Sequence, residues 1–428
     1  MFRSNWSLRR TSPTTLRRTE PLPGTWGGWR QSPLSCWSRW GNIGQSFPKS
    51  HLWGGGSDVA EATHGLGGLK YDPAKRTRAP EWNVFGALVL IVLIFEILNR
   101  MQGGSFLFNM RDNVDAIFNQ QRLDIMILQV AIVGIIALGV TQVIIIGGID
   151  LSSGSVVGVT AMVVMSFAQT ALVNGNPNPK AIFGDWAMDL PVIVPIVVGL
   201  ACGLLAGLIN GLLVAYTKIP PFIATLGMMV SARGAARWWS NGQPVSFPTE
   251  NFGSLANGDL LGSMTFGVLH WPGQNPAVVF VLLAILFHVI MTYTLYGKRS
   301  YAIGSNEAAA RMSGINVDHH KVLVYTIAGI LAAVAAVLLT SKNLTAQAGM
   351  GVMYELDAIA MAVIGGISLA GGRGSILGTV LGAMIFSVII SGFTSIKLDA
   401  YYQEMVKGAI IVGAVVLDQW RQRKRTRG

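Results

Sequence analysis

Charged residues are scarce in this sequence, and their scarcity excludes most soluble folds. Asp, Glu, Lys and Arg make up 12% of the 428 residues, whereas hydrophobic residues make up 51%. A soluble domain usually carries about 25% charged residues. The long apolar runs also lack the two-residue alternation of membrane β-strands, which excludes a transmembrane β-barrel. The sequence therefore predicts an all-α, polytopic membrane helix bundle.

Recognisable enzyme chemistry is also missing. The two cysteines, Cys36 and Cys202, are far apart, and Cys202 lies inside an apolar run, which leaves no disulfide framework. No His/Cys cluster has the spacing of a metal site, and no GxxxxGK[ST] loop is present to hold ATP phosphates. No nucleophile is paired with a base. We therefore expect no catalytic residue, no metal and no bound cofactor in this chain.

The net charge of +11 does not indicate a nucleic-acid partner. Its basic residues lie in the N-terminal region, in the loops and in the final RQRKRTRG, as at the cytoplasmic ends of membrane proteins. The first 80 residues hold six of the twelve tryptophans among Arg, Ser, Pro and Gly, without periodicity. We expect residues 1–80 to be a disordered extension, or to lie upstream of the true start codon. The alternative is a basic, aromatic tail that touches anionic lipid.

Apolar run length predicts about ten membrane spans within a transmembrane domain at 81–421, followed by a basic cytoplasmic tail at 422–428. The spans are 84–98, 125–146, 156–173, 192–216, 222–238, 277–296, 322–340, 358–369, 376–392 and 405–417. Several are shorter than the 18 residues that a simple crossing needs, and 358–369 above all is a candidate for a broken or re-entrant helix.

Lysine and arginine predict the orientation of these spans. The loop at 297–321 and the C-terminal tail are basic, so both should be cytoplasmic, and ten spans place the N-terminus there too. The polar loop at 240–276 then lies outside. Arg100, Arg111 and Arg122 also fall outside in this arrangement and count against it.

An acidic residue stands at the end of a long uncharged run. Residues 125–148 carry no charge, and Gly147-Gly148-Ile149-Asp150-Leu151-Ser152 follows at their end. A carboxylate next to hydrocarbon is costly, so Asp150 requires a wet or protein-lined environment. Together with Ser152 and Ser155, it indicates a transport pathway. Further polar candidates for that pathway lie inside the spans: Gln129, Gln142 and Asn210, the last of which either lines a pathway or bridges two helices.

Two other glycine patterns are informative. Gly199, Gly203, Gly207 and Gly211 recur every four residues and share one helix face, where small residues let another helix approach closely in lipid. The segment Gly147–Ser152 is also echoed by 365–370, which reads GGISLA. The echo arises either from duplicated halves, as in many transporters, or by chance. Arg233 and Arg237 lie in the span after Pro220-Pro221. A buried Arg there either forms an ion pair with Asp150 or extends its charged end toward the membrane surface.

The basic loop predicts a short helix. Ser305 or Asn306 can cap a helix that begins near Glu307, and Gly314 is well placed to end it. An exposed helix of this kind either docks on a soluble partner or is an ordinary connector.

Four stretches carry a resemblance to a known family. They are GGIDLSSGSVVG (147–158), IPPFIATLGMM (219–229), YAIGSNEAAARMSGI (301–315) and AVIGGISLAGGRGSILGTVLGA (362–383). The chain resembles the inner-membrane permeases of bacterial ABC importers for ribose, xylose, arabinose and galactose-like sugars, over about residues 81–421. Ser153 departs from the pattern, which more often has Val there.

The resemblance implies the partners. A separate cytoplasmic ABC ATPase would bind ATP and supply the energy, an extracytoplasmic binding protein would deliver the sugar, and a second permease chain, identical or a sister, would complete the pore in the bilayer. Glu307, Ala308, Ala309 and Gly314 match the family's loop that docks on the ATPase. Asp150, Ser152 and Ser155 match positions near its translocation path.

The leading hypothesis is thus the permease subunit of an ATP-driven importer for a monosaccharide or a polyol such as inositol. Two alternatives remain open. One is a secondary transporter driven by an ion gradient, with Asp150 as the coupling acid. The other is a permease of the related branched-chain amino-acid group.

Overall fold

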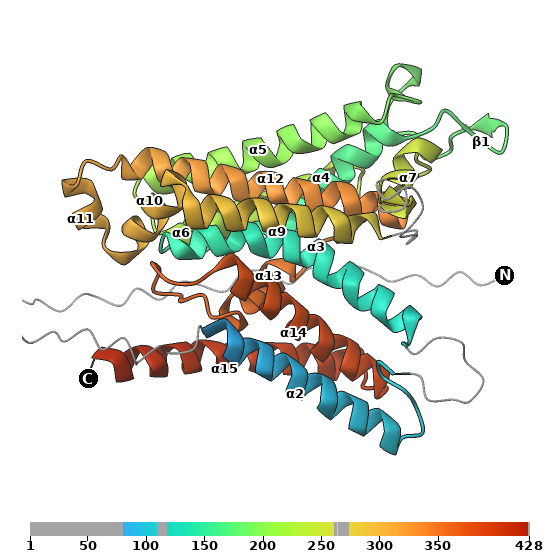
Figure 1. The fold of residues 1–428 in the computed structure, drawn as a ribbon. Helices are drawn as coiled ribbons and strands as arrows, with labels where there is room; N and C mark the ends of the chain where they lie inside the picture. The colour runs from blue at the N-terminus through green and yellow to red at the C-terminus, as the bar shows by residue number, and fades with distance from the viewer. Residues whose placement is uncertain (1–79, 109–117, 261–262, 264–273, 427–428) are drawn as a thin grey trace, which may run out of the picture. The chain divides into compact units, whose positions relative to one another are not determined.

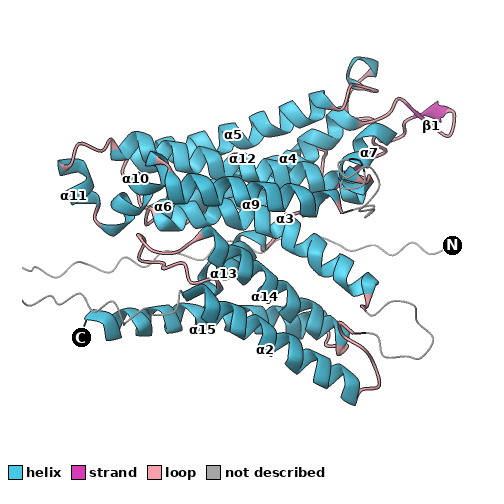
Figure 2. Ribbon diagram, in the orientation of Figure 1, coloured by secondary structure: helices cyan, strands magenta, loops and turns pink. Residues whose placement is uncertain are grey.

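The computed structural model describes residues 80–108, 118–260, 263 and 274–426. The predicted N-terminal extension at 1–80 therefore lies outside the described residues, apart from Pro80. Helices make up most of the described chain (Figures 1 and 2). In chain order the elements are α2 (Pro80–Met101), α3 (Gln120–Ile145), α4 (Ser153–Ala168), β1 (Leu172–Val173), β2 (Asn176–Pro177), η2 (Asp185–Ala187), α5 (Ile193–Tyr216), α6 (Pro221–Trp239), β3 (Val245–Ser246), α7 (Glu250–Asn257), α9 (Asn275–Tyr293), α10 (Leu295–Ser305), α11 (Glu307–Met312), α12 (Val317–Asn343), β4 (Thr345–Ala346), α13 (Tyr354–Ile364), α14 (Ile376–Ser395) and α15 (Ala400–Thr426).

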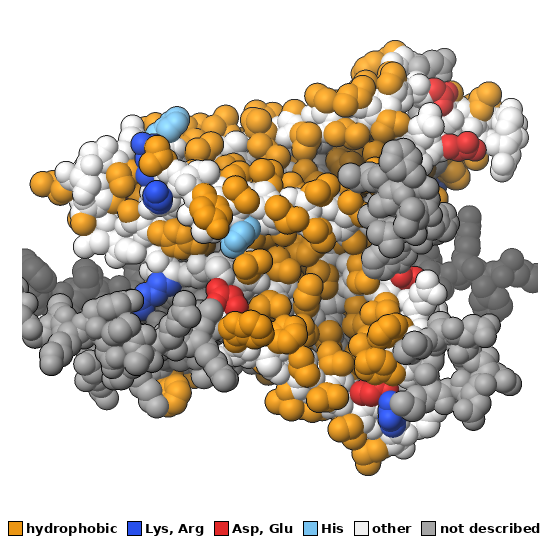
Figure 3. All heavy atoms as spheres, viewed as in Figure 1, with side chains coloured by type: hydrophobic (Ala, Val, Ile, Leu, Met, Phe, Trp, Pro, Cys, Tyr) orange, Lys and Arg blue, Asp and Glu red, His pale blue; other side chains and the backbone are white. Residues whose placement is uncertain are grey.

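Six of the described helices are long and apolar enough to cross a membrane: α2, α3, α5, α9, α12 and α14. Their outer faces carry apolar side chains; Leu93, Val197 and Ile285, on α2, α5 and α9, are each about half exposed. Figure 3 shows a largely hydrophobic face. The all-α membrane bundle predicted from composition is therefore confirmed, whereas the count of ten spans is not.

Two predicted spans differ from the observed helices. The span at 156–173 runs too far, because α4 ends at Ala168 and the chain then turns extended. There Gln169 Nε2 donates to the carbonyls of Lys180 and Ser246, which fixes the chain as a loop. The span at 358–369 is an eleven-residue helix, α13, that begins at Tyr354. At 1.5 Å per residue it is about 16 Å long, roughly half of the hydrocarbon thickness, as expected of a broken helix.

Helix α12 packs most extensively against α5, and glycine makes the contact close. A Cβ atom on Gly203, Gly207 or Gly211 would overlap the backbone of α12 at Gly329, Thr326 or Val322. The other member of the stripe, Gly199, faces Val164 of α4 and Val337 of α12. The face predicted from the four-residue spacing therefore lies against α12 and α4. Such backbone proximity supplies the van der Waals contact that holds helices together in lipid.

Two antiparallel two-stranded ladders lie in the loops between the helices. Strand β1 pairs with β2, and β3 pairs with β4 through Val245↔Ala346 and Ser246↔Thr345. The hydroxyls of Ser246 and Thr345 lie 2.8 Å apart and reinforce the second ladder. The ladder joins the chain after α6 to the chain after α12. The opposite ends of these helices carry α10 and α11 (Figure 1).

Candidate translocation site and docking helix

Helix α3 stops at a glycine-dependent turn that leads to Asp150. The amide of Gly148 donates to the Val143 carbonyl (2.9 Å), and the amide of Gly147 donates to that of Ile144 (2.9 Å). Gly147 has a φ of +82°, which glycine adopts without strain. The chain then runs without helical structure to Ser152 and begins α4 at Ser153. Asp150 therefore lies at a break between two apolar helices.

A hydrogen-bond network holds Asp150 at this break. Its Oδ1 accepts from the Ser152 amide (2.8 Å) and from Ser152 Oγ (2.6 Å). Ser152 Oγ in turn accepts from Asn210 Nδ2 of α5 (2.8 Å). All three side chains are buried. Asn210 thus bridges α5 to the break, while its Oδ1 has no hydrogen-bond partner among the described residues and remains available.

A second break faces the first. The chain between β4 and α13 passes α4 without helical structure, and its Gly351 and Met353 both have positive φ. A Cβ atom on Gly154 would overlap the carbonyl of Gly351 and the side chain of Glu355. The close approach of α4 to this segment therefore depends on Gly154. Non-helical backbone at this depth is tolerated only inside protein or beside water.

The alternative in which Arg233 pairs with Asp150 is wrong. Arg233 Nη1 of α6 donates instead to the Met350 carbonyl (3.3 Å) in the second break. The acid whose charge it offsets is Glu355, which is 6% exposed. The neighbouring Asp357, 4% exposed, pairs with Lys407 of α15 (3.3 Å). The sequence analysis missed both acids. The signal that could have revealed them is that Glu355 and Asp357 directly precede the short apolar run at 358–369.

Unpaired buried polar atoms gather around α4. Those that lack a hydrogen-bond partner among the described residues there are Ser153 Oγ, Ser155 Oγ, Thr160 Oγ1, Asn210 Oδ1, Tyr325 Oη and Glu355 Oε2. Buried polar groups are costly unless they are hydrogen-bonded. Hydroxyls, an amide and a carboxylate in this state can bind a polar solute that passes between the helices.

The remaining sequence candidates do not all belong to this set. Gln142 is satisfied, because its Oε1 accepts from Tyr296 Oη (2.8 Å) and its Nε2 donates to the Leu138 carbonyl (3.0 Å). Gln129 lies thirteen positions before Gln142 on α3, and the two residues are about 20 Å apart along the helix axis. The structure therefore brings together Asp150, Ser152 and Asn210 and leaves both glutamines apart. Among the described residues, no group of three or more His, Cys, Asp or Glu could hold a metal ion.

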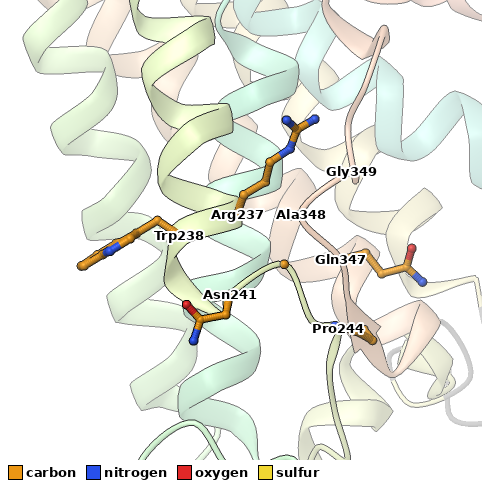
Figure 4. A pocket seen from close by; sticks show the side chains of 8 residues that line it. Arg237, Trp238, Asn241, Pro244, Gln347, Ala348 and Gly349 are labelled. Atoms are coloured by element: carbon orange, nitrogen blue, oxygen red, sulfur yellow. The ribbon is translucent and has the colours of Figure 1, made fainter. Parts of the chain in front are cut away.

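An open hollow of about 810 Å³ lies between the end of α6 and the chain after β4. Its lining includes Arg237, Asn241, Pro244 and Gln347. In Figure 4 the Arg237 side chain lies between α6 and the segment that carries Ala348 and Gly349, whereas that of Trp238 points away. None of the described residues that line the hollow is acidic. Arg233 lies one helical turn further along α6, so polar groups continue from the hollow toward the second break.

The short helix predicted in the basic loop is present. Helix α11 spans Glu307–Met312, and Asn306, rather than Ser305, caps it by accepting from the Ala309 amide (3.0 Å). Gly314, at φ +82°, ends it, with the Ile315 amide donating to the Ala310 carbonyl (3.1 Å). Both ends are therefore set by local sequence, as the capping rules require.

An ion network fixes α11 against α12. Arg311 donates to Glu307 (3.1 Å) and to Asp318 (2.9 Å to Oδ2), and Lys321 Nζ donates to Glu307 (2.8 Å). The hydrogen bond from Lys321, assisted by that from Arg311, lowers the pKa of Glu307 below its usual value. Glu307 is thus occupied within the chain. The exposed side chains of α11 that take no part in this network are the apolar ones of Ala308, Ala309 and Met312, the last of which is 90% exposed.

Comparison with known proteins identifies relatives that match most of the chain. The family model described as branched-chain amino acid transport system / permease component matches residues 122–415, more than half of the chain. The ribose import permease protein RbsC of Bacillus subtilis is 37% identical over 337 residues, which cover 78% of this chain and 91% of that protein. RbsC of Escherichia coli K12 is 33% identical over 337 residues, covering 78% and 94%.

A second group of relatives is named for another sugar. The galactose/methyl galactoside import permease protein MglC of Haemophilus influenzae is 35% identical over 295 residues, which cover 68% of this chain and 84% of that protein. No solved structure matches the chain.

Proposed function

This chain belongs to the branched-chain amino acid transport system / permease component family, and from that membership we propose that it is the permease subunit of an ATP-driven importer for a monosaccharide or a related polyol. The observation that carries the proposal is the similarity to permeases named for ribose and for galactose import, at 33–37% identity over two thirds or more of both chains. The chain is a multi-pass membrane protein, and we place it in the bacterial inner membrane.

The chemistry around α4 supports a neutral, hydroxyl-rich substrate. The unpaired groups there are mostly hydroxyl and amide oxygens, including Ser155 Oγ and Asn210 Oδ1. Two of the nearby charged groups are engaged, Asp150 by Ser152 and Arg233 by the Met350 carbonyl, whereas Glu355 Oε2 lacks a hydrogen-bond partner among the described residues. A sugar offers hydroxyls that both donate and accept, so it can satisfy such groups without bringing a charge into the membrane.

The energy source is a separate ABC ATPase in this proposal, and α11 is the element that docks on it. The apolar face at Ala308, Ala309 and Met312 is held on a rigid, capped helix. A helix of this kind fits an apolar groove on a soluble protein. Glu307 acts indirectly, since its carboxylate binds Arg311 and Lys321 within the chain. This assignment places α10, α11 and both termini in the cytoplasm.

The opposite end of the helices then faces outward. The hollow at Arg237, beside the β3–β4 ladder, becomes the mouth at which an extracytoplasmic binding protein releases its sugar. From there a polar route leads past Arg233 to the two breaks beside α4. A second permease chain completes the pore, either as an identical copy or as a sister subunit.

The test is purification followed by transport. A tagged chain is extracted in mild detergent, and the proteins that accompany it are identified by mass spectrometry. We expect an ABC ATPase, and in proteoliposomes with ATP and the cognate binding protein we expect uptake of D-ribose, D-galactose or myo-inositol.

Two results would contradict the proposal. Uptake of L-leucine in preference to all three probes would assign the chain to amino-acid transport, to which the family description also refers. Uptake driven by an ion gradient, with no ATPase in the preparation, would make it a secondary transporter and Asp150 its coupling acid.

A further inference from the structure

Three segments that are distant in the sequence meet at a junction made of glycines. They are the end of α3 at Ile145–Gly147, the end of α10 at Tyr301–Ser305, and the chain at 371–374 between α13 and α14. The Gly372 amide donates to the Ile145 carbonyl (2.8 Å), and this hydrogen bond joins the end of α3 to the chain at 371–374. Tyr301 Oη donates to the Gly374 carbonyl (2.9 Å), which links α10 to the same segment.

Gly304 lies at the centre of this junction. A Cβ atom there would overlap the Ile145 carbonyl oxygen and would lie 2.5 Å from the Gly372 amide nitrogen. A Cβ atom on Gly371 would likewise lie 3.0 Å from the Gly304 oxygen and 3.1 Å from Gly147 Cα. Three stretches of backbone therefore touch without side chains between them. Such a contact passes displacement directly, because no flexible side chain can absorb it.

On one side the junction is connected to the docking helix. Asn306 ends α10, with its amide donating to the Ala302 carbonyl (3.1 Å), and the same residue caps α11. No linker separates the two helices, so a push on α11 moves the end of α10. Ser305 Oγ donates to the Tyr301 carbonyl (2.8 Å) and stiffens that end further.

On the other side the junction is connected to both breaks. Ile145 is the last residue of α3, and the glycine turn at Gly147 leads from it to Asp150. The chain at 371–374 follows α13, which begins beside Glu355 at the second break. The docking helix thus reaches both sides of the candidate pathway through a single set of backbone contacts.

We propose that Gly304 is a positioning residue for energy coupling, which transmits movement of α11 to the two breaks through its contacts with Ile145 and Gly372. The inference rests on the proposed function, since it needs an ATPase that moves α11. Its measurable consequence is a change in the ratio of substrate transported to ATP hydrolysed, rather than in assembly of the complex. A glycine needed only for packing would not change that ratio in the protein that assembles.

The experiment compares Gly304→Ala with the native chain in the complete importer. The complex is reconstituted with its ATPase and binding protein. Uptake of radiolabelled D-ribose, D-galactose or myo-inositol, whichever the native complex transports, is measured together with ATP hydrolysis. We expect Gly304→Ala to retain the ATPase and to hydrolyse ATP, while uptake per ATP falls about tenfold, a typical size for a coupling between sites. Gly86→Ala is the matched control, because a Cβ atom at Gly86 meets open space.

A milder variant covers the case in which Gly304→Ala does not reach the membrane. Tyr301→Phe removes only the hydrogen bond to Gly374 and should lower uptake per ATP about fivefold, the low end of such couplings. Tyr293→Phe, at an exposed tyrosine of α9, is its control.

The outcomes separate the two proposals. An unchanged ratio in an assembled Gly304→Ala or Tyr301→Phe complex overturns the inference and leaves the proposed function intact. Loss of the ATPase from an otherwise folded Gly304→Ala also overturns it, because the glycine would then serve docking. Absence of ATP-driven uptake by the native complex removes the proposed function and the inference with it.

Discussion

The substitution Ser152→Ala tests the network at the first break most directly. It removes two hydrogen bonds of Ser152 Oγ, one donated to Asp150 and one accepted from Asn210, and it leaves both partners buried. A bond to a carboxylate contributes about 2 kcal/mol and a neutral one about 1 kcal/mol. Hydrogen bonds measured between membrane helices average only about 0.6 kcal/mol, so the bond from Asn210 should contribute less than 1 kcal/mol. We therefore expect a loss of about 2.5 kcal/mol in the free energy of unfolding.

The assay is thermal unfolding of the detergent-purified protein. At about 2 °C per kcal/mol for a chain of this size, the midpoint should fall by about 5 °C. Ser231→Ala, at an exposed serine of α6, supplies a control for the loss of a hydroxyl and should not shift the midpoint.

A double-mutant cycle separates the network from general packing. If Asn210 acts through Ser152, then Ser152→Ala and Asn210→Ala together should destabilise less than the sum of the single variants. Two results would show that the observed hydrogen bonds do not hold the break together. One is strict additivity of the two substitutions, and the other is a Ser152→Ala midpoint within 1 °C of the native one, where a shift of about 5 °C is expected.

Three further substitutions test other parts of the structure. Gly207→Leu drives a side chain into the backbone of α12 and should prevent stable assembly, as seen in detergent size-exclusion profiles, whereas Gly234→Leu, with open space at its Cβ position, should be tolerated. Lys407→Ala leaves Asp357 buried and unpaired and should lower the unfolding free energy by about 3 kcal/mol, and adding Asp357→Asn should recover most of that loss in the same thermal assay. Met312→Asp places a charge on the exposed tip of α11 and should weaken binding of the ATPase in pull-downs about thirtyfold, the scale of a hot-spot residue, and full recovery would argue against docking through this face.

The parts of the fold that depend on local sequence were predictable. Helix α11 begins and ends where a capping residue and Gly314 predict it, because both signals act within one turn. The four-residue glycine spacing on α5 likewise predicts a close helix contact, since the spacing alone places Gly203 and Gly207 on one face. Its partner, α12, was not predictable, because nothing in a single apolar helix specifies which neighbour it meets.

The parts that depend on distant partners were missed. Helix α13 begins four residues before the predicted span because Glu355 and Asp357 are tolerated inside the protein. Lys407, fifty positions away, makes this possible for Asp357, and no local pattern reveals that pairing. The partner of Arg233 was missed for the same reason. Pairing with Asp150 was one alternative, but the group that accepts its hydrogen bond is the backbone carbonyl of Met350, which no local pattern reveals.

The echo between Gly147–Ser152 and residues 365–370 has a physical explanation. Both segments end a helix in the same way, through two hydrogen bonds that backbone amides donate to carbonyls of the last helical turn. The amides are those of Gly147 and Gly148 in the first segment and of Gly366 and Ile367 in the second. The equivalent positive-φ residues are Gly147 and Gly366, whereas the sequence echo aligns Gly147 with Gly365. The register is thus displaced by one residue. The shared requirement is a glycine just past the helix end, and this requirement produces the common glycine without any duplication of the chain.

The ion network on α11 also determines how the complex should respond to ionic strength. Glu307 and Asp318 are balanced by Arg311 and Lys321, so the four charges cancel over a short distance. Beyond one Debye length such a set exerts little field, and added salt has little to screen. The association with the ATPase would then survive high-salt washing and would weaken instead with harsher detergents, which compete for the apolar face around Met312.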